Sequence, residues 1–197
     1  MAAKKTAAIR AFVALDLDPM SLRRVVRVAD RLRMSSGAPS ATWVPGPKMH
    51  VTLRFMGALP EAAVAALSKS LGTLTEGKAA PKPCALRLAA FPSIEDAEIV
   101  VVELDDAALS VTKLAEKVDK LASKLGVVGD RRAFRPHVTL ARLKRAYDSR
   151  RWLRQELVQG AGECRAQSVT LYRSDVAEEG ATYVPLARFE FAAKTPD

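Results

Sequence analysis

The tetrapeptide His-Val-Thr-Leu occurs twice in this chain, at residues 50–53 and at residues 137–140. The two phrases contain the only two histidines in the sequence. Each is short, apolar and β-branched, which is typical of a β-strand. Because side chains alternate between the two faces of a strand, the histidine and the threonine of each phrase would share one face. If the two strands lie together, they form a site with two imidazoles and two hydroxyl groups.

Such a site is suited to acid–base chemistry at an anion, and its residues are His50, Thr52, His137 and Thr139. Histidine titrates near neutral pH, so one ring can accept a proton while the other donates one. Threonine hydroxyls can donate hydrogen bonds to phosphate oxygens, where charge accumulates during phosphoryl transfer. The alternative is two ordinary, half-buried strand histidines, which explains less well why both histidines occur in identical phrases.

We expect this site to work without a metal ion or other cofactor. A catalytic zinc site usually has three protein ligands, and threonine is not among the usual ligand types. The sequence contains no glycine-rich phosphate-binding loop and no recurring carboxylate cluster for magnesium. Cys84 and Cys164 are far apart in sequence and lack metal-ligand spacing, so we expect two free thiols in a reducing compartment.

The net charge is +9, and the basic residues are concentrated around the second phrase. Between residues 126 and 154, nine basic residues occur with only two acidic ones. The basic residues are Arg131, Arg132, Arg135, Arg142, Lys144, Arg145, Arg150, Arg151 and Arg154. This basic stretch would attract an anionic partner such as RNA. For any single arginine the alternative is a solvated surface position.

The length allows one domain with a substantial core, and we expect residues 1–197 to form a single two-lobed domain. No apolar run is long enough to cross a bilayer. Charged residues interrupt the apolar segment near the N-terminus, which argues against a signal peptide. We therefore expect a monomeric, cytoplasmic protein with no membrane partner.

Apolar periodicity and turn residues predict the elements that position the two phrases. Strands are expected at 9–17, 42–44, 49–55, 84–90, 97–104, 136–143, 165–172 and 182–191, and helices at 19–32, 61–71, 107–125 and 149–157. Short turns between neighbouring strands favour antiparallel pairing, which indicates the α+β class. We expect two pseudo-symmetric lobes of mainly antiparallel sheet with outer helices, and an active-site cleft between the lobes.

The paired phrases and their flanks resemble the two-histidine phosphoesterase superfamily. Within it they are most similar to the RNA 2′,3′-cyclic phosphodiesterases, formerly called 2′-5′ RNA ligases. The family signature is a pair of His-x-Thr-x motifs, and the flanking residues that match are 10–16, 43–44, 55–57, 134–136, 141–142 and 171–174, with Gly180, Tyr183 and Leu186. The chain departs from relatives at Ala90, where a glycine is usual, and in strand 97–104, which lacks a frequent tryptophan.

The resemblance implies an RNA 2′,3′-cyclic 3′-phosphodiesterase, a phosphoric diester hydrolase that acts on RNA ends or small nucleotides and leaves a 2′-phosphate. It assigns His50 as proton donor to the departing 3′-oxygen and His137 as proton acceptor from water. Thr52 and Thr139 would bind the phosphate, and Arg142 would bind substrate. Because Arg142 lies five residues after His137, strict alternation turns it away from the site unless the strand bends.

Two other functions stay open from the sequence. The same acid and base would serve a 2′-5′ RNA ligase that joins a 2′,3′-cyclic phosphate end to a 5′-hydroxyl end. A noncatalytic RNA-binding protein would use the basic stretch alone. Both histidine motifs are intact, which favours an enzyme.

Overall fold

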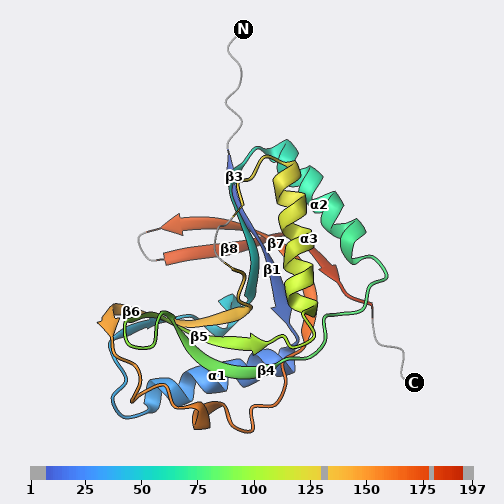
Figure 1. Cartoon of the computed structure of the whole chain (residues 1–197). Helices are drawn as coiled ribbons and strands as arrows, with labels where there is room; N and C mark the ends of the chain where they lie inside the picture. Colours follow the sequence, from blue (N-terminus) through green and yellow to red (C-terminus); the bar gives the residue numbers. More distant parts are fainter. Residues whose placement is uncertain (1–7, 130–132, 178–179, 193–197) are drawn as a thin grey trace, which may run out of the picture.

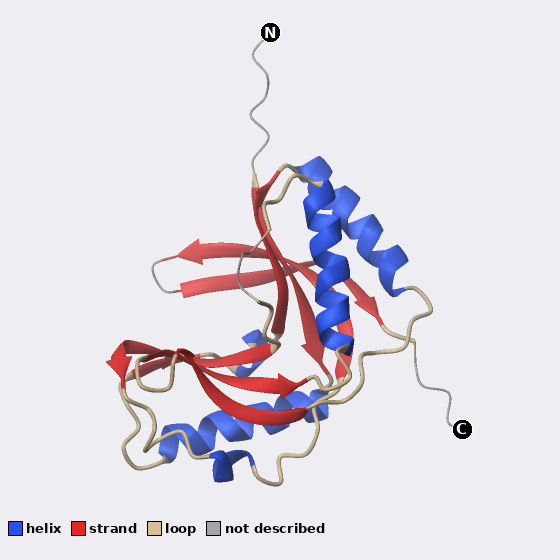
Figure 2. Cartoon of the chain, viewed as in Figure 1, coloured by secondary structure: helices blue, strands red, loops and turns tan. Residues whose placement is uncertain are grey.

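The computed structural model describes residues 8–129, 133–177 and 180–192 (Figures 1 and 2). The strands are β1 (Ile9–Leu17), β2 (Ala41–Trp43), β3 (Val51–Leu59), β4 (Ala85–Pro92), β5 (Ala97–Asp105), β6 (His137–Tyr147), β7 (Ala166–Ala177) and β8 (Gly180–Glu190). The α-helices are α1 (Pro19–Met34), α2 (Glu61–Thr75) and α3 (Ser110–Lys124), and short 3-10 helices span Gly46–Lys48 and Gln155–Val158.

The eight strands form one sheet in the order β4-β5-β6-β3-β1-β7-β8, with β2 paired to β6. Every strand pair is antiparallel, so the predicted α+β class is confirmed. The two halves of the sheet meet where β3 pairs with β6 through Val51 and Val138. We call β4, β5, β6 and β2 the first lobe, and β3, β1, β7 and β8 the second lobe (Figure 1). The centre of the sheet is therefore the junction of the two histidine phrases.

Helix α1 starts with a strong local signal and lies along the first lobe, beside β4 and β5 in Figure 1. The Asp18 carboxylate accepts a hydrogen bond from the Ser21 amide at 2.7 Å, and Pro19 occupies the first helical turn. Its apolar face buries Val25 and Leu32 completely, and each fully buried side chain of this size contributes about 1.5–3 kcal/mol. Helices α2 and α3 instead cover the second lobe, where α3 packs on β3 and α2 on β8.

Helix α3 begins later than residue 107, where the sequence predicted it. The Asp106 carboxylate accepts hydrogen bonds from the amides of Ser110, Val111 and Thr112, at 2.7 to 3.2 Å. Leu109, just before the helix, has a left-handed backbone with φ of 53°. A capping carboxylate four residues upstream therefore sets the first turn, and the apolar periodicity alone placed the start too early.

The predicted basic helix at 149–157 is wrong, because only a 3-10 turn at Gln155–Val158 forms there. Tertiary contacts hold this segment in another shape. The Trp152 indole is buried and donates to the Leu32 carbonyl at 3.2 Å, at the end of α1. The Gln155 side chain bonds both backbone groups of Leu88, at 2.8 and 3.0 Å, along the edge of β4. These contacts outweigh a weak local helical tendency.

Cys84 and Cys164 form a second link between the lobes. They lie opposite each other as an antiparallel bridge, with amide-to-carbonyl distances of 3.0 and 2.8 Å. Both thiols are free, as expected, and burial raises the pKa of each to about 11. Among the helices of the described chain, we find none with the length and apolarity needed to span a bilayer.

Candidate active site

The two His-Val-Thr-Leu phrases lie side by side at the lobe junction. Val51 of the first phrase pairs with Val138 of the second, and the strands are antiparallel. An antiparallel pair relates its two strands by a local twofold axis, which here passes between the two valines. Both valines are completely buried. The histidine and threonine of each phrase therefore occupy the opposite face, where all four side chains are half-buried.

Each histidine ring is held in the same way by its own strand. The Nδ1 of His50 donates to the Lys48 carbonyl at 2.8 Å, and the Nδ1 of His137 donates to the Arg135 carbonyl at 2.6 Å. Because a carbonyl oxygen can only accept, both Nδ1 atoms carry the hydrogen. Each Nε2 is thereby left for chemistry. The Nε2 of His50 lies 3.1 Å from the Thr52 hydroxyl.

Aromatic rings fix the orientation of both imidazoles. Phe12 of β1 is buried and stacks on His50, with ring centroids 5.0 Å apart and planes inclined by 26°. Tyr183 of β8 meets His50 edge-on at 5.5 Å. On the other lobe, Phe91 of β4 meets His137 edge-on at 5.0 Å. These ring contacts, together with the Nδ1 hydrogen bonds, restrict rotation of both imidazoles, so each Nε2 keeps a defined direction.

A carboxylate lies near His50 on the neighbouring strand. The pairing of β1 with β3 places Asp16 next to His50. Asp16 accepts hydrogen bonds from three hydroxyls of β7, those of Ser168 at 3.0 Å, Thr170 at 2.6 Å and Tyr172 at 3.0 Å. These neutral donors leave the negative charge of Asp16 in place. Burial lowers the pKa of His50, and the Asp16 charge acts in the opposite direction.

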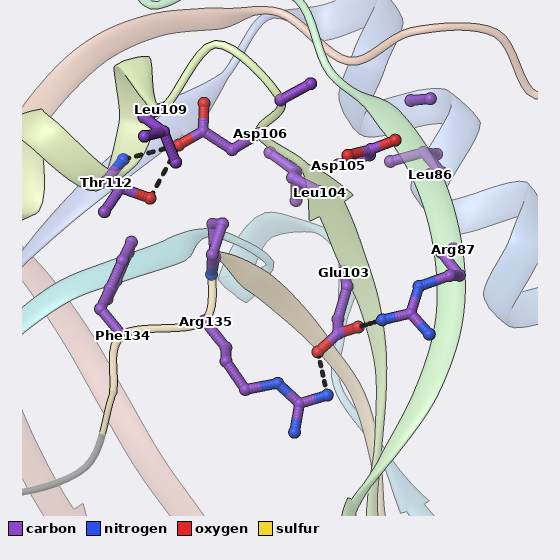
Figure 3. Close-up of a pocket in the computed structure, with 13 residues that line it drawn as sticks. Leu86, Arg87, Glu103, Leu104, Asp105, Asp106, Leu109, Thr112, Phe134 and Arg135 are labelled. Carbon is purple, nitrogen blue, oxygen red and sulfur yellow. Dashed lines mark hydrogen bonds and ion pairs between the residues drawn. The ribbon is translucent and has the colours of Figure 1, made fainter.

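A second carboxylate lies opposite His137, but its charge is compensated. Glu103 of β5 pairs directly with His137 in the strand register and is buried. It forms ion pairs with two guanidinium groups, those of Arg87 and Arg135 (Figure 3). Burial lowers the pKa of His137; Glu103 opposes that effect, and the charge of Arg135 adds to it. Each histidine thus has a neighbouring carboxylate, and the one beside His137 is paired with two arginines.

Sequence reasoning missed both carboxylates. Each is an acidic residue between apolar neighbours in a largely apolar strand, Asp16 in strand 9–17 and Glu103 in strand 97–104. This pattern is a usable signal, because a charge inside a buried strand needs a specific partner. The identity of the partners could not be predicted, since they lie on strands far away in the chain.

A β-bulge brings Arg142 to the histidine face. The register of β5 against β6 skips Leu140, and both Leu140 and Ala141 are buried. The extra residue shifts the alternation by one position, so Arg142 lies on the same face as His137. Its charge contributes to lowering the pKa of His137. The strand is thus irregular where Arg142 needed it to be in order to face the site. The role of Arg142 in substrate binding stays a prediction.

The basic stretch is only partly described, because Arg131 and Arg132 lie outside the described residues. Arg150 is exposed and forms an ion pair with Asp148, which lowers the pKa of that carboxyl to about 2. The remaining basic residues of β6 and of the following loop, Arg142, Lys144, Arg145, Arg151 and Arg154, are exposed. This surface can meet an anionic polymer, and its function stays a prediction.

The residues that meet at this site can transfer protons, but they do not form an ordinary metal site. Within the described ranges, no three His, Cys, Asp or Glu side chains lie close enough together to bind one ion. A cavity of about 590 Å³ lies beside the histidines rather than over them, and Arg135 lines it (Figure 3). The site therefore offers two oriented imidazole nitrogens, two hydroxyls and one nearby arginine.

Comparisons with known proteins agree with this arrangement. The family model described as LigT like Phosphoesterase matches residues 15–101. An RNA 2′,3′-cyclic phosphodiesterase of Aquifex aeolicus is 25% identical over 186 residues, covering 92% of this chain and 96% of the relative. A protein of the same name from Aeropyrum pernix is 27% identical over 174 residues, covering 86% and 96%.

The solved structures show the same fold. E. coli LigT in complex with 3′-AMP superposes with a TM-score of 0.70 at 20% identity, covering 94% of this chain and 99% of LigT. The fold, the paired motifs and the sequence matches over nearly the whole chain agree with one another. The chain is thus similar to the two-histidine phosphoesterases in sequence and has their fold.

Proposed function

We propose that this chain is an RNA 2′,3′-cyclic phosphodiesterase that hydrolyses the cyclic phosphate to a 2′-phosphate. The observation that carries the proposal is the pairing of Val51 with Val138, which puts two oriented imidazoles and two hydroxyls on one face. The relatives that share most of the chain carry the same name. The family comparison supports the reaction class, and the site residues support its chemistry.

The reaction needs one proton removed and one supplied. The Nε2 of His137 accepts a proton from water as the water oxygen forms a bond to phosphorus. The bond between phosphorus and the 3′-oxygen breaks, and the Nε2 of His50 donates a proton to that oxygen. Thr52 and Thr139 donate hydrogen bonds to the non-bridging oxygens, where charge accumulates. The products are a 2′-phosphate and a free 3′-hydroxyl.

The local charges support this division of roles. The uncompensated Asp16 carboxylate favours the protonated form of His50, as an acid requires. Near His137, the charge of Glu103 favours the protonated form, and the charges of Arg135 and Arg142 oppose it, as a base requires. Two rings with the same sequence context thus receive different electrostatic surroundings. This difference supports the assignment of His50 as acid and His137 as base.

The proposed reaction uses proton transfer and hydrogen bonds, and it requires no metal ion. A 2′-5′ ligation to a 5′-hydroxyl end uses the same groups in the same roles: the 5′-hydroxyl replaces water as the nucleophile, His137 accepts its proton, and His50 donates a proton to the departing 3′-oxygen. Water at high concentration favours hydrolysis. The natural substrates are RNA ends or small nucleotides that carry a 2′,3′-cyclic phosphate, and the enzyme acts as a monomer in the cytoplasm.

The test uses an RNA oligonucleotide with a 2′,3′-cyclic phosphate end, with and without a second oligonucleotide that has a 5′-hydroxyl. We expect the wild type to open the cyclic phosphate and to form little joined product. His50→Ala and His137→Ala should each lose about two to four powers of ten in rate. Equal rates for wild type and the two variants would refute the proposed function, and mainly joined product would favour the ligase.

A further inference from the structure

The cavity beside His137 has the size and chemistry of a nucleotide site. Its volume of about 590 Å³ lies within the range of about 300–1,000 Å³ that is common for small-molecule sites. Its walls come from the start of β4, the end of β5, the first turn of α3 and the segment before β6 (Figure 3). None of these side chains donates or accepts a proton in the reaction described above, although Glu103 and Arg135 influence the pKa of His137.

One end of the cavity carries excess positive charge. Arg87 and Arg135 both point toward the Glu103 carboxylate, which forms an ion pair with each of them (Figure 3). One carboxylate cannot neutralise two guanidinium groups, so the cluster keeps one positive charge. The Arg87 and Arg135 side chains are 63% and 50% exposed. Each guanidinium has five N–H donors, so donors remain free for a phosphate.

The other end of the cavity has an aromatic and aliphatic wall, with the carboxylates of Asp105 and Asp106 beside it. Phe134 and Leu109 line it together with Leu104 (Figure 3), and Leu109 is 53% exposed. Asp105 lies at the exposed edge and can accept hydrogen bonds from ribose or base donors. Asp106 is already engaged by the first turn of α3, so this helix end is closed to an external anion. The cavity thus combines a cationic end with an aromatic and aliphatic wall.

The cationic end is directly connected to the catalytic residues. The carbonyl of Arg135 holds the Nδ1 of His137, while its guanidinium lies 4.5 Å from the centre of the Phe91 ring. The same Phe91 ring packs edge-on against His137. A ligand phosphate on this guanidinium would therefore lie one aromatic ring away from the catalytic imidazole. This separation between the Arg135 guanidinium and the His137 imidazole is comparable to the separation between adjacent phosphates of an RNA chain.

We propose that this cavity binds the second nucleotide of an RNA substrate, the one adjoining the nucleotide with the cyclic phosphate. Its phosphodiester contacts Arg87 and Arg135, and its base packs against Phe134 and Leu109. This inference rests on the proposed function and extends it, because it makes the enzyme prefer an RNA end over a free cyclic mononucleotide. Base–aromatic packing and phosphate contacts are both tolerant of sequence, so the preference concerns chain length.

The test compares kcat/KM for a dinucleotide with a 2′,3′-cyclic phosphate end and for 2′,3′-cyclic AMP. Arg87→Gln removes the guanidinium at an exposed position, and we expect the dinucleotide-to-mononucleotide ratio to fall about tenfold or more. Arg87→Lys keeps the positive charge but loses the planar guanidinium that can donate two parallel hydrogen bonds to a phosphate, so it should give an intermediate ratio. The matched control is Arg173→Gln, another strand arginine paired with a carboxylate, which should leave the ratio unchanged.

Three results are distinguishable. A ratio that falls in Arg87→Gln and not in Arg173→Gln supports the nucleotide site. A wild type that hydrolyses both substrates, with the same ratio in Arg87→Gln, overturns this inference and leaves the proposed function intact. A wild type that hydrolyses neither substrate overturns the proposed function itself.

Discussion

Replacing Asp16 by Asn removes the negative charge nearest to His50 while keeping the shape of the side chain. In the wild type this carboxylate opposes the effect of burial on the pKa of His50. The substitution should therefore lower that pKa further. If His50 is the acid, it must be protonated to act, so the fall of kcat/KM at high pH should begin at a lower pH. The bell-shaped profile should become narrower on its alkaline side.

The stability of the variant can be worked out from the hydrogen bonds of Asp16. One carboxylate oxygen accepts from Ser168 and Thr170, and the other accepts from Tyr172. An asparagine that keeps its oxygen toward the first two presents its NH2 group to Tyr172, so the charge-assisted bond from Tyr172 is replaced by a neutral one in the opposite direction. A hydrogen bond to a charged group contributes about 1.5–3 kcal/mol, which lowers Tm by roughly 3–12 °C in a protein of this size. With a total stability of about 5–15 kcal/mol, the variant remains folded.

Glu103→Gln is the matched experiment on the other lobe. It removes the charge that opposes the lowering of the pKa of His137, so that pKa should fall. His137 must be neutral to act as base, so the rise of kcat/KM at low pH should begin at a lower pH. The pH profile of kcat/KM thus becomes broader on its acidic side in Glu103→Gln, whereas it becomes narrower on its alkaline side in Asp16→Asn. The assay is kcat/KM for 2′,3′-cyclic AMP as a function of pH. If Asp16→Asn moves the acidic limb, or if Glu103→Gln moves the alkaline limb, the assigned roles are wrong.

Three other predictions concern the same site. On a diester with p-nitrophenoxide as leaving group, His50→Ala should recover most of its activity, because that anion leaves without needing a proton. His137→Ala still lacks its base and should not recover; if it is the variant that recovers, the acid and base roles are reversed. Burial lowers the pKa of both histidines in the free enzyme, and the negative charge of a bound phosphate should raise both pKa values. The pH profile of kcat should therefore lie at higher pH than the profile of kcat/KM, and coincident profiles would contradict this. Leu140→Ala at the completely buried bulge should cost about 2–5 kcal/mol, measured by denaturant unfolding, and a cost below 1 kcal/mol would show that the bulge is loosely packed.

Local patterns in the sequence were enough to predict that the two His-Val-Thr-Leu phrases form strands, and to predict most of the other helices and strands. Alternating apolar residues identified β1 and β3, and the Asp18-Pro19 pair identified the start of α1. These features depend on neighbours within a few residues. For the same reason, the identical phrases predicted which side chains share a face before any strand pairing was known.

The remaining features depend on partners that are distant in the chain. The hydroxyls that bind Asp16 come from β7, and the arginines that compensate Glu103 come from β4 and from the segment before β6. An alternating pattern predicts the buried face of a strand, but not which strand lies beside it. The bulge at Leu140 interrupts the alternation itself, so the direction of Arg142 could not be derived by counting. The 149–157 segment was predicted as a helix because its contacts with α1 and β4 are invisible locally.

The most direct test of the central claim is turnover by the chelated enzyme. Enzyme treated exhaustively with a chelator is incubated with 2′,3′-cyclic AMP, and the product is followed by phosphorus NMR. Two histidines paired across β3 and β6 should convert the cyclic phosphate to 2′-AMP at an undiminished rate. Loss of turnover that one added metal ion restores, or formation of 3′-AMP, would contradict the account.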